Sequence, residues 1–234
     1  MRCITDKNIE RVDLLTAKYC FKCTQTNVEC IDQTIHFICY FYDLFGVHLL
    51  NIAFIYFSHT DVTGQLIEAA HKEIKKDGVN CILHQILGSE IIEGRFINPQ
   101  LMNSLLHCDA IIFGSPTYMG NVAAQFKAFA DATSDFWSNQ RWTGKVAAGI
   151  TSGTGLNGDQ TSTLQYFSTL ASQHGMIWIG LDTPYNAGKN NINRLGCQLG
   201  VTACSPNGDV HPADISSARY LARRVVSITK KLAD

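Results

Sequence analysis

Residues 51–78 read NIAFIYFSHTDVTGQLIEAAHKEIKKDG and contain the pattern that decides the fold. Residues 52–57 form a short apolar run, which is typical of a strand buried on both faces of a sheet. From Thr63 to Lys76 the apolar residues recur at helical spacing, and Gly78 is a residue type that commonly ends a helix. A buried strand, a polar loop and an amphipathic helix in this order predict a parallel sheet with helical crossovers.

The same alternation continues to the end of the chain. We expect further strands over residues 79–87, 110–114, 146–151 and 176–181, and further helices over residues 98–108, 121–136, 160–174 and 212–232. A long loop is expected over residues 182–211. Strands that alternate with helices form a parallel sheet covered on both faces, with right-handed crossovers. The predicted fold is therefore α/β, a three-layer sandwich around a five-stranded parallel sheet.

The composition indicates a folded domain that does not bind nucleic acid. The 234 residues are 46% hydrophobic and carry 19 Lys+Arg against 20 Asp+Glu, so disorder and binding to a phosphate backbone are both disfavoured. Residues 1–48 hold 5 Lys+Arg and 6 Asp+Glu, which leaves 14 of each in residues 49–234. We expect an N-terminal extension of unknown role over residues 1–48 and one ligand-binding domain over residues 49–234.

The extension is rich in cysteine but lacks a complete metal-binding pattern. Cys20 and Cys23 form a CxxC pair, whereas Cys30 and Cys39 are nine residues apart and do not form the second pair that zinc sites usually have. No strand-helix-strand pattern surrounds the CxxC pair, which argues against a thioredoxin-type redox site. We therefore expect no bound metal. The odd total of nine cysteines, without a recognisable signal peptide, favours free thiols in a reducing cytoplasm.

Residues 35–57 could alternatively be interpreted as a membrane-spanning helix. Residues 35–57 are largely apolar over 23 residues, which is long enough to cross a bilayer. The segment includes His36, Asp43 and Asn51, which are costly in lipid, and its last third is needed as the first strand of the sheet. We therefore expect no membrane span.

Ligands of parallel α/β sheets bind outside the carboxyl ends of the strands, so three loops are candidate binding segments. The first loop supplies hydroxyl groups and a helix N-terminus, a combination that can hold a phosphate without Lys or Arg. It consists of Ser58, His59, Thr60, Asp61, Val62 and Thr63. It matches neither the Rossmann nor the P-loop glycine pattern. Ordinary helix capping is the alternative, and the Asp61 carboxylate argues against a phosphate.

The second and third loops can accommodate a flat ring. The second loop brings small residues and apolar side chains together, and consists of Pro116, Thr117, Tyr118, Met119, Gly120 and Asn121. Its alternative interpretation is a tight turn with Asn121 as helix cap. The third loop offers backbone N–H groups to a polar ring edge, and consists of Ser152, Gly153, Thr154, Gly155, Leu156 and Asn157. A flexible loop is the alternative there.

With these three loops taken together, residues 51–234 resemble the flavodoxin-like superfamily. They are most similar to the FMN-dependent NAD(P)H:quinone oxidoreductases first named as tryptophan-repressor-binding proteins. The resemblance is carried by the segments IYFSHT at 55–60, IFGSPTYMGN at 112–121, AAQFKAF at 123–129, GK at 144–145, TSGTG at 151–155, HGM at 174–176 and DISSARY at 214–220. It implies a flavodoxin-like, FMN-binding domain over residues 49–234.

The resemblance assigns a role to each loop. The first would hold the FMN phosphate, the second would line the ribityl chain and the isoalloxazine ring, and the third would contact the pyrimidine side of the ring. His174, the candidate catalytic residue for proton transfer, would lie near the flavin in the same or a neighbouring subunit, and Trp137 would line the quinone pocket. From the residues alone, His174 can equally cap a helix end, and Trp137 can equally be a core residue. Asp61 stands where the family has a glycine.

The implied activity is transfer of two electrons from NADH or NADPH through FMN to a quinone, by a cytoplasmic homo-oligomer, either a dimer or a tetramer. Two alternatives are a flavodoxin-type electron carrier and an NAD(P)H-dependent FMN reductase, and a third is a binding protein that lacks flavin. Dedicated carriers are usually strongly acidic, whereas residues 49–234 are formally neutral. The charge balance therefore favours the enzyme.

Overall fold

The computed structural model describes residues 49–233. The cysteines of the predicted extension and residues 35–48 of the apolar stretch lie outside the described residues. Within residues 49–233, no helix is both long and apolar enough to cross a bilayer.

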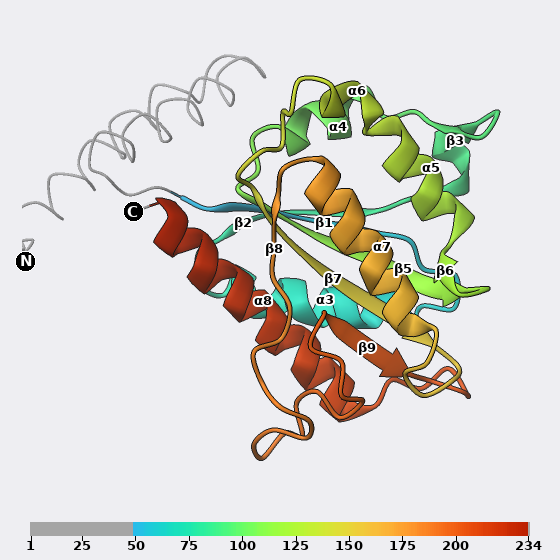
Figure 1. The fold of residues 1–234 in the computed structure, drawn as a ribbon, viewed down its shortest axis with the longest axis vertical. Coiled ribbons are helices and arrows are strands. Elements are labelled where there is room, and N and C mark those ends of the chain that lie inside the picture. The colour runs from blue at the N-terminus through green and yellow to red at the C-terminus, as the bar shows by residue number, and fades with distance from the viewer. Residues whose placement is uncertain (1–48, 234) are drawn as a thin grey trace, which may run out of the picture. The chain divides into compact units, whose positions relative to one another are not determined.

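A parallel sheet with five strand positions forms the centre of the described chain (Figure 1). Four positions are occupied, in spatial order, by β2 (Asn80–Gln85), β1 (Asn51–Tyr56), β5 (Ala110–Tyr118) and β7 (Val146–Gly153). The fifth position is shared by β8 (Ile177–Trp178) and β9 (Val201–Cys204), which both pair with β7 in parallel. The predicted five-stranded parallel sheet is thereby confirmed.

Helices cover both faces of the sheet and give the predicted three layers (Figure 1). One face is covered by α3 (Val62–Lys75) and α8 (Pro212–Ala233), and the other by α4 (Pro99–Leu105), α5 (Ala124–Ala132) and α7 (Gln160–Gln173). Residues of β1 alternate between the two cores, with Phe54 on the α3 side and Ile55 on the α5 side. This alternation on a doubly covered strand explains why β1 reads as a continuous apolar run.

The fifth strand position differs from the sequence prediction, which placed one strand over residues 176–181 and a loop over 182–211. β8 pairs only with Val146 and Ala147, and the chain then leaves the sheet and returns as β9 opposite Ile150–Gly153. Glycines stand at both ends of this excursion. A side chain at Gly180 would collide with the backbone of Gln198, and one at Gly200 would collide with the backbone of Gly149. Glycine is therefore needed at both ends of the excursion, where another backbone segment comes close.

The predicted helix over residues 121–136 is wrong at its start. β5 continues to Tyr118, and β6 (Asn121–Val122) pairs with it in an antiparallel hairpin. The helix itself begins at Ala124, breaks at Thr133 and resumes as the short α6 (Ser134–Trp137). A second small hairpin of η2 (Gly88–Glu90), β3 (Ile91–Ile92) and β4 (Arg95–Phe96) precedes α4 and was not predicted.

Candidate functional site

The three candidate loops lie at one edge of the sheet, where the parallel strands have their carboxyl ends. The strand register places them side by side, because Tyr56 pairs with Gly114, and Pro116 pairs with Ser152. β9 adds a fourth strand end, since Cys204 pairs with Gly153. β1 and β5 are neighbours whose following helices cover opposite faces, so the loops after them flank the topological switch point, which is where this class of sheet binds ligands.

Hydroxyl contacts hold the three loops in place at this edge. Thr63 Oγ1 lies 2.8 Å from Ser152 Oγ, which joins the first loop to the third. Thr117 Oγ1 lies 2.9 Å from Thr151 Oγ1 and 2.8 Å from Thr163 Oγ1, which joins the second loop to β7 and α7. These side chains are buried or half-buried. The loops are therefore held together by largely buried hydroxyl contacts and are not three independent turns.

The first loop surrounds the N-terminus of α3. Ser58 Oγ accepts a hydrogen bond from the Gly64 N–H at 3.1 Å, so this serine contacts the first turn of the helix that follows it. Asp61 precedes the helix in the left-handed conformation, with φ of 65°, and its side chain caps no N–H group. The Asp61 carboxylate is folded over Gly64, close to where a side chain there would stand. An anion at this helix N-terminus would meet N–H groups and hydroxyls, but also one carboxylate.

The second loop is the turn of the β5–β6 hairpin. Met119 and Gly120 both have positive φ, 49° and 77°, which is the pattern of a type I′ turn. Met119 is fully exposed and Tyr118 is partly exposed, so the turn presents apolar surface at this edge. Asn121 does not cap α5, because its Oδ1 accepts from the N–H of Val122 within the hairpin. The alternative interpretation of Asn121 as a helix cap is wrong.

Two buried residues that support the loops were not among the site residues expected from the sequence. The Ser115 hydroxyl accepts from the Ala123 N–H at 2.9 Å and holds the hairpin against the start of α5. Gln160 is 3% exposed, and its amide bonds both to the third loop and to β9. Ser115 directly precedes the second loop and Gln160 follows the third loop by three residues, so proximity in sequence was the signal that could have singled them out.

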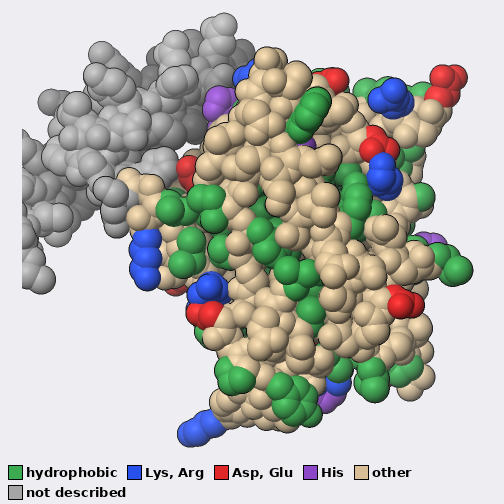
Figure 2. Space-filling model, viewed as in Figure 1, with side chains coloured by type: hydrophobic (Ala, Val, Ile, Leu, Met, Phe, Trp, Pro, Cys, Tyr) green, Lys and Arg blue, Asp and Glu red, His purple; other side chains and the backbone are tan. Residues whose placement is uncertain are grey.

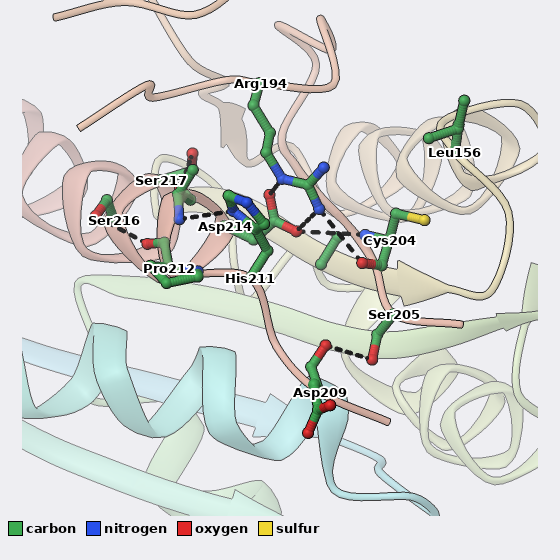
Figure 3. A network of polar contacts seen from close by, with 12 residues as sticks. Leu156, Arg194, Cys204, Ser205, Asp209, His211, Pro212, Asp214, Ser216 and Ser217 are labelled. Atoms are coloured by element: carbon green, nitrogen blue, oxygen red, sulfur yellow. Dashed lines mark hydrogen bonds and ion pairs between the residues drawn. The ribbon is translucent and has the colours of Figure 1, made fainter. Parts of the chain in front are cut away.

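A largely buried ion pair between Arg194 and Asp214 lies beside the end of β9 (Figure 3). Arg194 donates to both oxygens of Asp214, from Nε at 2.8 Å and from a terminal nitrogen at 2.7 Å. The Cys204 N–H also donates to Asp214, at 3.3 Å. Asp214 is 1% exposed, and this burial raises its pKa despite the opposing effect of Arg194. The pair fastens the excursion over residues 182–200 to β9 and to the first turn of α8.

The structure does not bring His174 to the loops. α7 begins beside the third loop and is 14 residues long, so His174 at its far end lies about 20 Å along the helix axis. The side chain is 2% exposed and packs against Trp142, with ring centroids 4.7 Å apart and the rings tilted by 41°. Its Nε2 lies 2.8 Å from Thr133 Oγ1, and the Thr133 hydroxyl donates to the Ala130 carbonyl. Nε2 therefore carries the proton, and burial lowers the pKa of the ring.

Because His174 is enclosed by its own chain, the prediction that it contacts the flavin has no support in this arrangement. Its observed place agrees with the alternative weighed from the sequence, a histidine at a helix end. Trp137 is also remote from the loops, since α5 leads away from the second loop and α6 continues beyond it (Figure 1). Trp137 is 52% exposed, so it is a surface residue and not a core residue.

The residues at the loops fit FMN. A helix N-terminus with the Ser58 and Thr63 hydroxyls suits the phosphate, and the exposed apolar side chains of the hairpin suit the ring. The exposed part of the third loop offers backbone groups for a polar ring edge. Asp61 is the single residue of the set whose charge opposes a phosphate. This combination of fold and site defines a flavodoxin-like α/β protein.

Comparison with known proteins agrees with this class. The family model of the NADPH-dependent FMN reductases matches residues 51–185, which is more than half of the chain, and the chain belongs to this family. The resemblance stated from the sequence is thereby confirmed for family and fold. The protein is an FMN-dependent oxidoreductase of the flavodoxin-like type.

Individual relatives carry two kinds of name. A flavodoxin, FldP, of Pseudomonas aeruginosa is 41% identical over 131 residues, which are 53% of this chain and 71% of the relative. An NAD(P)H dehydrogenase (quinone) of Geobacter sulfurreducens is 29% identical over 202 residues, which are 78% of this chain and 99% of the relative. The crystal structure of a WrbA-like flavodoxin from Agrobacterium tumefaciens matches with a TM-score of 0.62 at 32% identity, covering 78% of this chain and 98% of that chain.

Proposed function

We propose that this protein binds FMN at the three loops and passes two electrons from NADH or NADPH to a quinone. The observation that carries the proposal is the hydroxyl network that joins the three loops at the switch point between β1 and β5. The names of the Geobacter relative and of further relatives with the same name support the donor and the acceptor.

Each loop has a part in this proposal. Residues 58–63 hold the phosphate against the N-terminus of α3, and residues 116–121 enclose the ribityl chain and one side of the ring. Residues 152–157 direct backbone N–H groups to the pyrimidine edge of the ring. When bound, FMN supplies the acceptor for a hydride and the store for two electrons, whereas the protein supplies binding, orientation and electrostatics.

A flavodoxin-type carrier is the second candidate, because the Pseudomonas relative is named a flavodoxin. Carriers that dock on protein partners rely on a strong field of one sign. Residues 49–234 instead hold 14 basic and 14 acidic residues, and Figure 2 shows both signs mixed on the face in view. The balance of charge favours a small-molecule acceptor. The third candidate, a reductase that releases reduced FMN, would differ from both in that the purified protein would hold flavin only weakly.

We also propose a cytoplasmic homo-oligomer in which a site is completed by a second copy. Trp137 is remote from the loops of its own chain and half-exposed, so it can line a quinone pocket only on another copy. Cys81, Cys108, Cys197 and Cys204 are all free thiols, which suits a reducing compartment. Residues 1–48 are proposed to be an extension outside this domain.

The test is a visible spectrum of the full chain with added FMN, followed by anaerobic addition of NADH or NADPH and then benzoquinone. We expect a bound flavin that bleaches with the nucleotide and recovers with the quinone. Riboflavin is the matched control, because it lacks the phosphate and should bind far more weakly. A bound flavin that the nucleotides do not bleach would favour the carrier. Failure to bind FMN would refute both candidates.

A further inference from the structure

Gln160 is a buried amide that joins the third loop to the sheet. Its Nε2 donates to the carbonyl oxygens of Gly155, at 3.1 Å, and Leu156, at 2.5 Å. Its Oε1 accepts from the Ala203 N–H of β9 at 3.1 Å. Both N–H bonds of the amide and one lone pair of its oxygen are therefore used, and they are used only by backbone groups.

These bonds fix the orientation of two consecutive peptide planes. In a trans peptide the C=O of one residue and the N–H of the next point in opposite directions. Since the carbonyls of Gly155 and Leu156 point at Gln160, the N–H groups of Leu156 and Asn157 point away from it. No acceptor for either N–H is present within the part of the chain that the structure describes. Gln160 thus leaves two N–H donors that point away from it.

We infer that Gln160 is a positioning residue that sets how strongly the third loop prefers reduced over oxidised FMN. The inference rests on the proposed function, in which this loop meets the pyrimidine edge of the ring. Reduction places negative charge at that edge, and hydrogen bonds to a charged acceptor are about twice as strong as those to a neutral one. Donors held in place before reduction stabilise this charge without reorganisation. Loss of the Gln160 amide therefore affects the reduced state most.

No other side chain described near Gln160 donates to the carbonyls of Gly155 and Leu156. Residues 154–156 are exposed, and the excursion over residues 182–200 contacts the loop through Asn157 Nδ2, which donates to the Leu195 carbonyl at 3.3 Å. That contact is made by the Asn157 side chain, whereas the carbonyls of Gly155 and Leu156 accept from Gln160. A methionine has the length of glutamine but no donor, and a glutamate has the shape of glutamine but, when ionised, no donor either.

The experiment compares Gln160→Met and Gln160→Glu with the wild type in the full chain. Gln165→Met is the matched control, because Gln165 is an exposed residue of the same helix. Dissociation constants for oxidised FMN and for anaerobically reduced FMN are measured for each protein, together with the two-electron midpoint potential. Circular dichroism and thermal unfolding of the apoproteins verify the fold.

For Gln160→Met we expect the affinity for reduced FMN to fall about tenfold more than that for oxidised FMN. For a two-electron couple this factor corresponds to a midpoint potential about 30 mV lower. For Gln160→Glu we expect a similar loss at neutral pH and partial recovery as pH falls, because a protonated carboxyl donates one hydrogen bond. Gln165→Met should match the wild type.

Equal loss of affinity for both forms of FMN would overturn the inference and leave Gln160 as a structural residue. An unchanged potential in a folded Gln160→Met protein would also overturn it. If Gln160→Met does not fold, the pH dependence of Gln160→Glu decides, and a pH-independent ratio of the two affinities would count against the inference. A wild type that binds neither form would refute the proposed function itself.

Discussion

Asp61 is the residue whose chemistry fits the proposed ligand least. It holds a φ of 65° just before α3, a conformation that glycine adopts freely and that aspartate tolerates better than most residues. Its carboxylate folds over the first turn of the helix, where the proposed phosphate binds. The sequence identified this conflict, and the structure shows that the side chain does not simply turn away from the helix.

Substitution of Asp61 by asparagine should strengthen FMN binding, because asparagine tolerates the same φ and removes the repulsion between two negative charges. We expect an affinity gain of about two- to fivefold, as is usual for one exposed charge, and a smaller gain at high salt. Fluorescence titration with FMN measures the effect, and riboflavin, without a phosphate, should show no gain. Weaker binding of Asp61→Asn would mean that the carboxylate itself helps to hold the ligand.

His174 makes the stability of the protein depend on pH. Burial lowers its pKa below the ordinary value of 6.5, so the unfolded chain binds a proton more readily than the folded protein does. The stabilising contribution of neutral His174 is complete above pH 6.5 and is lost as pH falls through the folded-state pKa. Below pH 6.5 the free energy of unfolding should therefore decrease, by at most about 1.4 kcal/mol per pH unit for this one proton.

Denaturant unfolding of wild type and His174→Gln between pH 8 and pH 5 measures this dependence. The variant should be less stable at pH 8 but should lose less stability on acidification. His107→Gln, at an exposed histidine, is the control and should keep the wild-type slope. Parallel curves for wild type and His174→Gln would contradict the assignment of the pH dependence to this residue.

At the scale of elements, the turn of the β5–β6 hairpin has a strained backbone at Met119. A type I′ turn requires positive φ at both central positions and favours Asn-Gly, whereas this chain has Met119-Gly120. Methionine at positive φ costs on the order of 1 kcal/mol, and strain of this kind is often kept at functional sites. The exposed Met119 side chain is the candidate reason for keeping it, since the proposal places this turn against the ring.

Met119→Asn should therefore raise the free energy of unfolding by about 0.5–1 kcal/mol, because the new residue fits the turn. Urea unfolding of the apoprotein measures the change. Met119→Ala is the matched control, since it removes the same apolar side chain but keeps the unfavourable φ, and it should give no gain. Equal stabilisation by both substitutions would trace the effect to loss of the exposed side chain instead of relief of strain.

At the scale of the whole molecule, charge separates the two candidate functions. A carrier attracted to its partner by a field of one sign loses association rate steeply as ionic strength rises. A domain with 14 charges of each sign that reduces a neutral quinone has no strong field of one sign, so its association rate with the quinone should depend little on salt. Between about 50 mM and 300 mM salt, kcat/KM for a neutral quinone should change less than about twofold.

Steady-state kinetics with benzoquinone at constant NADPH measures this salt dependence. Electron transfer to an added protein acceptor, measured in the same salt series, is the comparison. A steep loss with the protein acceptor, combined with poor turnover of the quinone, would favour the carrier.

The sequence was sufficient for the class of fold and for the three loops. Buried strands read as apolar runs, and the ends of such runs locate the loops without any knowledge of packing. Boundaries were less accurate where polar and apolar signals conflict, as in the second loop, whose residues form a hairpin and not the start of a helix. β9 is only four residues long and follows an irregular stretch, so local pattern did not separate it from the predicted loop over residues 182–211.

The sequence by itself determined the alternation of strands and helices, the hydroxyl-rich loops at their junctions and the neutral charge of residues 49–234. Only the tertiary structure decided that Thr63 meets Ser152, that Thr117 meets Thr163, and that His174 lies far from both. It also revealed Gln160, whose three partners come from two different segments. The physical reason is that periodicity records which face of an element is buried, whereas these contacts depend on where separate elements end in space.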